Sequence, residues 1–119
     1  FEYVLYPEVC TWYGAFRVAR ETGDTFLVKA LVSRFDPYLT EEHADGFPYR
    51  FHVDHCVNGV VPLEIYKVTG DERYREIGLK RADYQWEDPT EDGITRQARY
   101  WVDDIYMISA IQTAAALLE

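Results

Sequence analysis

The triplet Thr-Gly-Asp occurs twice, at residues 22–24 and again 47 positions later at residues 69–71. Each copy joins two segments whose apolar residues recur at helical spacing. Glycine ends a helix readily because it accepts the left-handed conformation, and aspartate is a good cap for the next helix. One helical hairpin cannot bury its apolar face alone, so neighbouring hairpins must stack. The repeat therefore predicts an all-α chain of stacked helical hairpins.

Five helices are expected from the apolar spacing and the turn residues. Pro7 suits the first turn of a helix, where its missing N–H is harmless, and Pro37 stops the second helix. Pro62 falls inside the third helix, so it is expected either to kink that helix or to move its start toward Asn58. The expected helices cover residues 7–22, 24–35, 54–69, 71–86 and 102 onward, with long loops at 36–53 and 87–100.

Two architectures fit repeated hairpins. An open solenoid would be a binding scaffold, whereas a closed double ring of helices, an α/α toroid, would place long loops and a pocket on one face. Here short Gly-Asp turns alternate with the long loops 36–53 and 87–100, which are rich in aromatic residues and arginine. This alternation favours the toroid with a functional face.

The net negative charge limits the kinds of molecule that the chain can bind. The chain has 21 acidic and 12 basic side chains, for a formal net charge of −9. Such a field repels nucleic acid and anionic membranes, and no apolar run reaches the roughly 18 residues of a membrane span. Aromatic residues make up 16% of the chain and suit stacking on sugar rings. An acidic sugar would still need local basic groups.

Two carboxylates begin helices directly after the two long loops. Asp54 lies in residues 52–56 (HVDHC), and Asp103 lies in residues 100–107 (YWVDDIYM). Either aspartate could be an ordinary helix cap. Their apolar and aromatic neighbours, however, would desolvate a carboxylate and favour its use as a general acid. Carboxylates at equivalent positions in successive hairpins would also point toward the opening of one shared pocket.

A metal site is not expected. His52, His55 and Cys56 stand beside Asp54, but no second histidine or cysteine cluster accompanies them. The two cysteines, Cys10 and Cys56, lie in apolar helical patterns and are expected to be buried free thiols.

Three motifs resemble the successive landmarks of glycoside hydrolase families 88 and 105, the unsaturated glucuronyl and rhamnogalacturonyl hydrolases. They are residues 12–14 (WYG), 53–56 (VDHC) and 101–107 (WVDDIYM). The resemblance implies an (α/α)6 toroid of six hairpins. Six repeats at this spacing need roughly 280 residues, so residues 1–119 are expected to be the N-terminal portion, about two and a half hairpins, of a single larger catalytic domain. Met107 is the only methionine, which also predicts a truncated chain.

The resemblance also implies a reaction and its residues. Such enzymes remove a 4,5-unsaturated uronic acid from lyase-generated oligosaccharides without a metal or organic cofactor. Asp103 matches the general acid/base and Asp54 the assisting carboxylate, whereas Asp104 is expected to face the helix cap or solvent. Aromatic residues matching the sugar subsite are Trp101 and Trp12 or Tyr13, for which core packing is the alternative.

One segment departs from the family pattern. Relatives often carry a histidine before the tryptophan, but residues 94–99 read ITRQAR. Arg96 or Arg99 could bind the uronate carboxylate as a bidentate fork instead, or could be an ordinary solvated side chain. His55, next to Asp54, completes the expected substrate contacts.

Another six-hairpin sugar enzyme and a helical-repeat scaffold remain alternatives, and the compartment is open between bacterial cytoplasm and periplasm.

Overall fold

The computed structural model describes residues 4–47 and 52–118, which form helices and loops without a strand. Within them, no helix combines the length and apolar character needed to cross a membrane. The α-helices are α1 (Tyr6–Thr22), α2 (Thr25–Phe35), α3 (Val53–Cys56), α4 (Val60–Thr69), α5 (Glu72–Tyr84) and α6 (Val102–Ala116). Three short 3₁₀-helices accompany them: η1 (Asp36–Leu39), η2 (Ala44–Gly46) and η3 (Val57–Gly59).

The two Thr-Gly-Asp turns form the hairpins that the repeat predicts. Gly23 and Gly70 both have φ of 69°, the left-handed conformation that a glycine accepts at a helix end. The next residue then caps the following helix: Asp24 accepts a hydrogen bond from the Leu27 N–H at 2.9 Å, and Asp71 accepts one from the Arg73 N–H at 3.0 Å. The repeated-hairpin prediction is thereby confirmed, with α1–α2 and α4–α5 as the two pairs.

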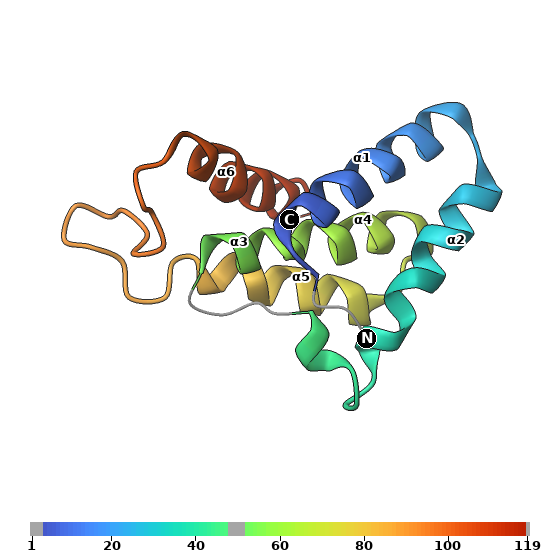
Figure 1. The fold of residues 1–119 in the computed structure, drawn as a ribbon, viewed down its shortest axis with the longest axis horizontal. Coiled ribbons are helices and arrows are strands. Elements are labelled where there is room, and N and C mark those ends of the chain that lie inside the picture. Colours follow the sequence, from blue (N-terminus) through green and yellow to red (C-terminus); the bar gives the residue numbers. More distant parts are fainter. Residues whose placement is uncertain (1–3, 48–51, 119) are drawn as a thin grey trace.

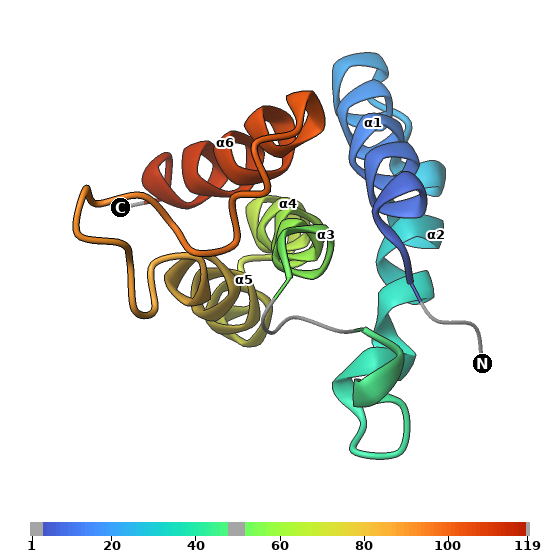
Figure 2. The ribbon, with the colours of Figure 1, turned by 60° about the vertical axis from the view of Figure 1, so that its left-hand side comes forward.

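Helix α4 lies at the centre of the molecule, between the α1–α2 hairpin and helices α5 and α6 (Figures 1 and 2). Its first six residues, 60–65, are all buried. The predicted helix 54–69 is interrupted: α3 is followed by η3, and α4 begins at Val60. Pro62 is therefore the third residue of α4, in the first turn, where a missing N–H breaks no intrahelical bond.

A buried aromatic cluster joins the first hairpin to the second. The Phe35 ring lies 4.8 Å from the Phe47 ring, 5.7 Å from the Tyr74 ring and 6.0 Å from the Trp12 ring, between centroids. Edge-to-face and tilted pairs at these distances add to the gain from burial. A buried carboxylate also links helices α1 and α4: Glu64 is 1% exposed, and its oxygens lie 2.7 Å from both Arg20 Nη1 and Lys67 Nζ.

The two long connections and the two short turns lie at opposite ends of the hairpins. The starts of α3 and α6 and the loop before α6 lie at one end, and the turns at Gly23 and Gly70 lie toward the other (Figure 1). The arrangement agrees with part of an α/α toroid, in which long loops and helix starts share one face.

Two glycines let η3 and α5 touch backbone to backbone. A Cβ atom added at Gly59 would lie 2.8 Å from the Arg81 Cβ, 3.1 Å from the Gly78 carbonyl oxygen and 2.4 Å from the Ile111 Cδ1. The first two neighbours belong to the backbone or lie next to it, so they cannot swing aside. This contact sets the distance between α5 and the segment that carries Asp54.

Replacing Gly59 by alanine is expected to destabilise the protein by about 1–3 kcal/mol, the usual cost of overpacking a filled core. Gly14→Ala is the matched control, because Gly14 lies exposed within α1 with no atom within 4 Å of an added Cβ. It should instead stabilise by about 0.5–1 kcal/mol. Denaturant unfolding of both variants measures the difference, and equal effects would contradict the packing argument.

Candidate active site

Asp54 and Asp103 occupy equivalent places, each as the second residue of its helix, α3 or α6. A carboxylate is stabilised there by the partial positive charge of the helix N-terminus. The two helix starts are brought together by a small apolar cluster in which Val53 and Val57 pack against Met107, all at most 1% exposed. Local sequence thus fixes each carboxylate on its helix, and apolar packing places the helices side by side.

Arg99 lies between these helix starts. Its Nη2 atom is 2.6 Å from Asp104 Oδ1, 3.1 Å from Asp54 Oδ1 and 3.7 Å from Asp103 Oδ2. Its Nη1 also donates to Asp54 Oδ2 at 3.4 Å. The guanidinium is 23% exposed, while the side chains of Asp54 and Asp103 are 25% and 40% exposed. We call these four residues the Arg99 group. It brings together the two carboxylates that the sequence singles out.

Asp104 caps α6, as expected, but it is buried instead of facing solvent, with a side chain 5% exposed. One of its oxygens accepts hydrogen bonds from the Arg99 Nε at 2.9 Å and Nη2 at 2.6 Å. The other accepts the backbone N–H groups of Arg99 and Trp101. Burial alone would raise the pKa of Asp104, but these hydrogen bonds and the Arg99 charge outweigh it and hold the pKa below its usual value.

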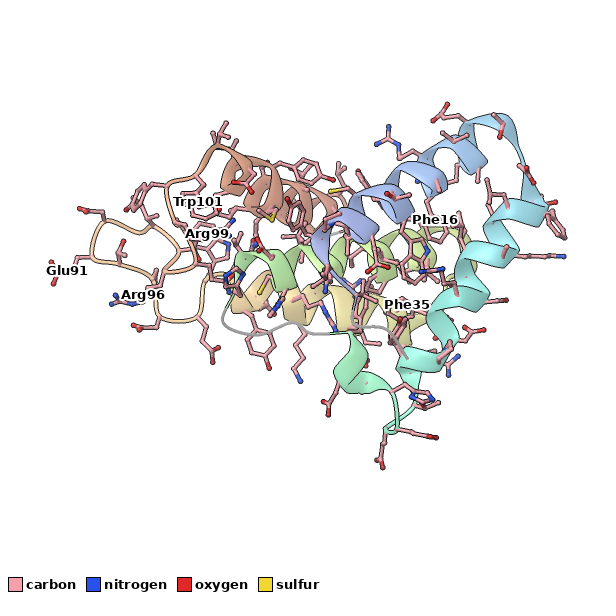
Figure 3. All side chains as sticks on the ribbon, in the orientation of Figure 1. Phe16, Phe35, Glu91, Arg96, Arg99 and Trp101 are labelled. Atoms are coloured by element: carbon pink, nitrogen blue, oxygen red, sulfur yellow. The ribbon has the colours of Figure 1, made fainter. Side chains whose placement is uncertain are left out.

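The same carboxylate explains an unusual backbone angle. Tyr100 has φ of 62°, a left-handed conformation that is costly for a bulky residue. The residues on either side of it both donate their N–H groups to Asp104, so Tyr100 is held in the sharp turn between them. The turn presents Trp101, which is 62% exposed, next to Arg99 (Figure 3). The Arg99 Cζ lies 4.5 Å from the centroid of the Trp101 ring.

Three other expected contact residues lie apart from the Arg99 group. Trp12 is 4% exposed and its indole N–H donates to the Leu31 carbonyl oxygen at 3.2 Å, so it takes the core-packing alternative. Tyr13 is half-buried on α1, and its hydroxyl accepts a 3.5 Å hydrogen bond from Arg17. Arg96 lies out in the loop (Figure 3), 2.9 Å from Asp88 in an exposed ion pair.

Two histidines stand beside Asp54. The His52 Nδ1 accepts the backbone N–H of Asp54 at 3.2 Å and lies 3.5 Å from its Oδ2. The His55 ring is half-buried, 5.3 Å from the His52 ring. Cys56 is buried, which raises the pKa of its thiol, and its sulfur accepts a hydrogen bond from Gln97 at 3.1 Å. In the part of the chain that the structure describes, no histidine, cysteine and acidic side chains are grouped to hold a metal ion.

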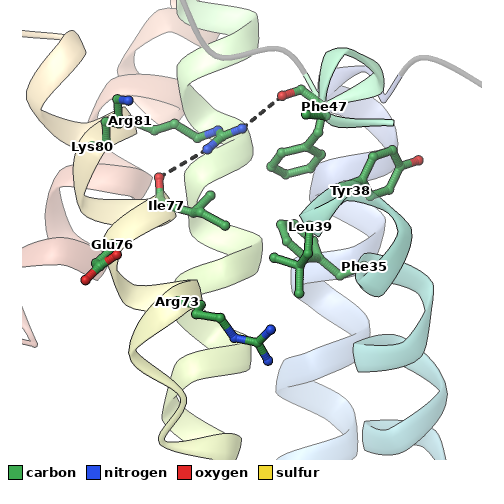
Figure 4. A pocket seen from close by; sticks show the side chains of 10 residues that line it. Phe35, Tyr38, Leu39, Phe47, Arg73, Glu76, Ile77, Lys80 and Arg81 are labelled. Carbon is green, nitrogen blue, oxygen red and sulfur yellow. Dashed lines mark hydrogen bonds between the residues drawn. The ribbon is translucent and has the colours of Figure 1, made fainter. Parts of the chain in front are cut away.

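A cavity of about 380 Å³ lies elsewhere, between α5 and the 3₁₀-helices η1 and η2 (Figure 4). Arg81 crosses it and donates to the carbonyl oxygens of Ile77 at 3.1 Å and Phe47 at 2.9 Å. This arginine therefore fastens the first long loop to α5. The cavity contains none of the residues of the Arg99 group.

A family model described as Glycosyl Hydrolase Family 88 matches residues 3–117. The chain belongs to this family. The comparisons with curated proteins and with solved structures return no match. Membership of family 88 makes the chain part of a glycoside hydrolase, with a carbohydrate as the substrate class. The match spans both carboxylate helices and the loop that carries Arg99, so the Arg99 group lies within the family's own sequence pattern.

The lowered pKa of Asp104 predicts a pH-dependent contribution to stability. A carboxylate whose pKa is lower in the folded than in the unfolded state stabilises above the unfolded value, here 3.8, and loses that effect as the pH falls through the folded value. The unfolding free energy of Asp104→Asn should therefore fall below that of the unmodified protein at pH 5–8, with a gap that closes progressively below about pH 4.

Asp88→Asn is the control for this experiment. Asp88 forms only an exposed ion pair with Arg96, and such pairs contribute little. Its unfolding free energy should track that of the unmodified protein at every pH. A gap for Asp104→Asn that stays constant down to pH 2 would show that its carboxylate is not stabilised by Arg99.

Proposed function

We propose that the protein containing this chain removes a 4,5-unsaturated uronic acid from the non-reducing end of oligosaccharides produced by polysaccharide lyases. One observation carries the proposal: two carboxylates at two helix starts flank one guanidinium, beside an exposed tryptophan, in a family 88 chain. Residues 1–119 then form the N-terminal portion of a single larger (α/α)6 catalytic domain, whose other hairpins complete the sugar site.

In this reaction Asp103 is the general acid and base. It donates a proton to C4 of the substrate's C4=C5 double bond, and positive charge develops at C5 and the ring oxygen. Water then adds at C5 and returns a proton to Asp103, giving a hemiketal that opens and releases the aglycone. Asp103 suits this role because it is the most exposed of the three carboxylates and the furthest from Arg99.

Asp54 is the assisting carboxylate. It is paired with Arg99 at 3.1 Å, and its negative charge would stabilise the positive charge that develops on the sugar. Trp101 offers an exposed ring on which the sugar stacks. Arg96 can take the substrate's carboxylate, because an exposed ion pair such as that with Asp88 is weak and easily exchanged.

Turnover is followed as loss of the ultraviolet absorbance of the conjugated C4=C5 bond. Unsaturated uronyl disaccharides from pectin lyases and from glycosaminoglycan lyases are supplied to the intact protein. Asp103→Asn and Asp54→Asn should each lower kcat by about 10²–10⁴-fold, the usual contribution of a general acid or base. Their unfolding free energies should change by only about 1 kcal/mol, the usual effect of a charge in the first turn of a helix.

The disaccharide that reacts fastest names the substrate. Asp45→Asn is the control for turnover, because Asp45 is exposed in η2 and outside the Arg99 group, and it should turn over normally. Full turnover by both Asp103→Asn and Asp54→Asn would show that the two carboxylates have a structural role alone. A well-folded protein without turnover on any of these sugars would move the assignment to another carbohydrate reaction.

The stacking role of Trp101 is tested by Trp101→Ala, with Trp86→Ala as the control. Both tryptophans are exposed, at 62% and 43%, but Trp86 lies in the turn after α5 and outside the Arg99 group. Trp101→Ala should raise KM by about fivefold, in line with roughly 1 kcal/mol for an aromatic contact. Trp86→Ala should leave KM unchanged. Equal KM values for the two variants would remove Trp101 from the sugar site.

A further inference from the structure

We infer that Arg99 is the positioning residue of the carboxylate pair: Asp104 holds its guanidinium in place, and the guanidinium in turn holds Asp54 and Asp103 at a fixed separation. It is then not the group that binds the carboxylate of the substrate. The catalytic consequence of this inference rests on the proposed function, whereas the placement of the two carboxylates by Arg99 does not.

The first support is the way Arg99 is anchored. A single oxygen of Asp104 accepts hydrogen bonds from both Nε and Nη2 of Arg99, at 2.9 and 2.6 Å. The Asp104 side chain is buried. It also accepts the backbone N–H of Arg99, so the side chain and the backbone of one residue are fixed by one carboxylate. Because the guanidinium is planar and rigid, this anchor sets the direction of its remaining N–H groups.

Those remaining groups face Asp54. Nη1 donates to Asp54 Oδ2 at 3.4 Å, and Nη2 lies 3.1 Å from Asp54 Oδ1, so the two nitrogens face the two oxygens of one carboxylate. Asp103 lies on the same side, 3.7 Å from Nη2. One anchored cation therefore contacts a carboxylate from α3 and a carboxylate from α6.

The charges of the Arg99 group argue against a role in binding the substrate anion. Among the residues that the structure describes, Arg99 is the one positive charge in contact with these three carboxylates, so a further carboxylate at Arg99 would be repelled. The other described groups at this cluster include His52, 3.5 Å from Asp54, and the Trp101 ring, 4.5 Å from the guanidinium. Neither adds a permanent positive charge. The hydrogen bond to Asp104 raises the pKa of Arg99, so Arg99 itself stays charged at every working pH.

The test combines a stability cycle with kinetics on the intact protein. Arg99→Gln, Asp54→Asn and the double variant are compared by denaturant unfolding. If Arg99 holds Asp54, the effects of the two substitutions are not additive. Additive effects would overturn the inference, and this readout needs no substrate, so it decides the question even if no unsaturated uronide is turned over and the proposed function fails. Arg99→Met, which keeps the aliphatic stem but removes the charge and the donors, replaces Arg99→Gln in the cycle if the glutamine variant does not fold.

Kinetics separate positioning from substrate binding. For a positioning residue, Arg99→Gln lowers kcat by about 10-fold or more with little change in KM. Arg99→Lys, which keeps the positive charge but not the planar set of donors, restores only part of kcat. A raised KM with unchanged kcat would instead make Arg99 the binder of the substrate's carboxylate and overturn the inference.

Discussion

The guanidinium of Arg99 and the three carboxylates around it depend on one another, and the end of the molecule that carries the candidate site is arranged by that dependence. Asp54 and Asp103 favour helix starts, where the helix dipole stabilises them, yet two such starts cannot approach closely while both carry uncompensated negative charge. Arg99 supplies the missing cation from the loop before α6. The loop, α3 and α6 are consequently tied at one point.

The ion pairs of Arg99 hold this geometry only because the surrounding helices are tightly packed. Val53 and Val57 pack on Met107 directly behind the carboxylates, and the close approach at Gly59 fixes the segment that follows α3 against α5. The aromatic cluster around Phe35 fastens the first hairpin to this frame. The catalytic roles proposed for Asp54 and Asp103 require a geometry held to fractions of an ångström, and short-range packing is what fixes their helices.

Sequence patterns specify the hairpins well because their signals are local. Glycine at a helix end, aspartate at the next cap and apolar residues at helical spacing act within a few residues, and the motif around Asp103 led to the family that the match confirms. The partners of Arg99 and the burial of Asp104 were not predictable in this way, and the burial of Trp12 was one of two alternatives that the sequence left open. Arg99 meets Asp54 across 45 positions, a contact that exists only once the helices have packed. The spacing of Arg99 from Asp103 and Asp104 was the one local hint of an ion pair.

The anchor at Asp104 has a consequence for how such a site can diverge. Replacing Asp104 by a small residue would leave Arg99 with fewer anionic partners and a guanidinium free to turn toward the sugar. The local charge would become less negative in the same step. The alignment of Asp54 and Asp103 and the attraction of an acidic ligand would thus both depend on the charge of Arg99, and a substitution at Asp104 would shift Arg99 from the first role to the second. Within this architecture, a single substitution at Asp104 would be enough to change the preference for more acidic or more neutral sugars.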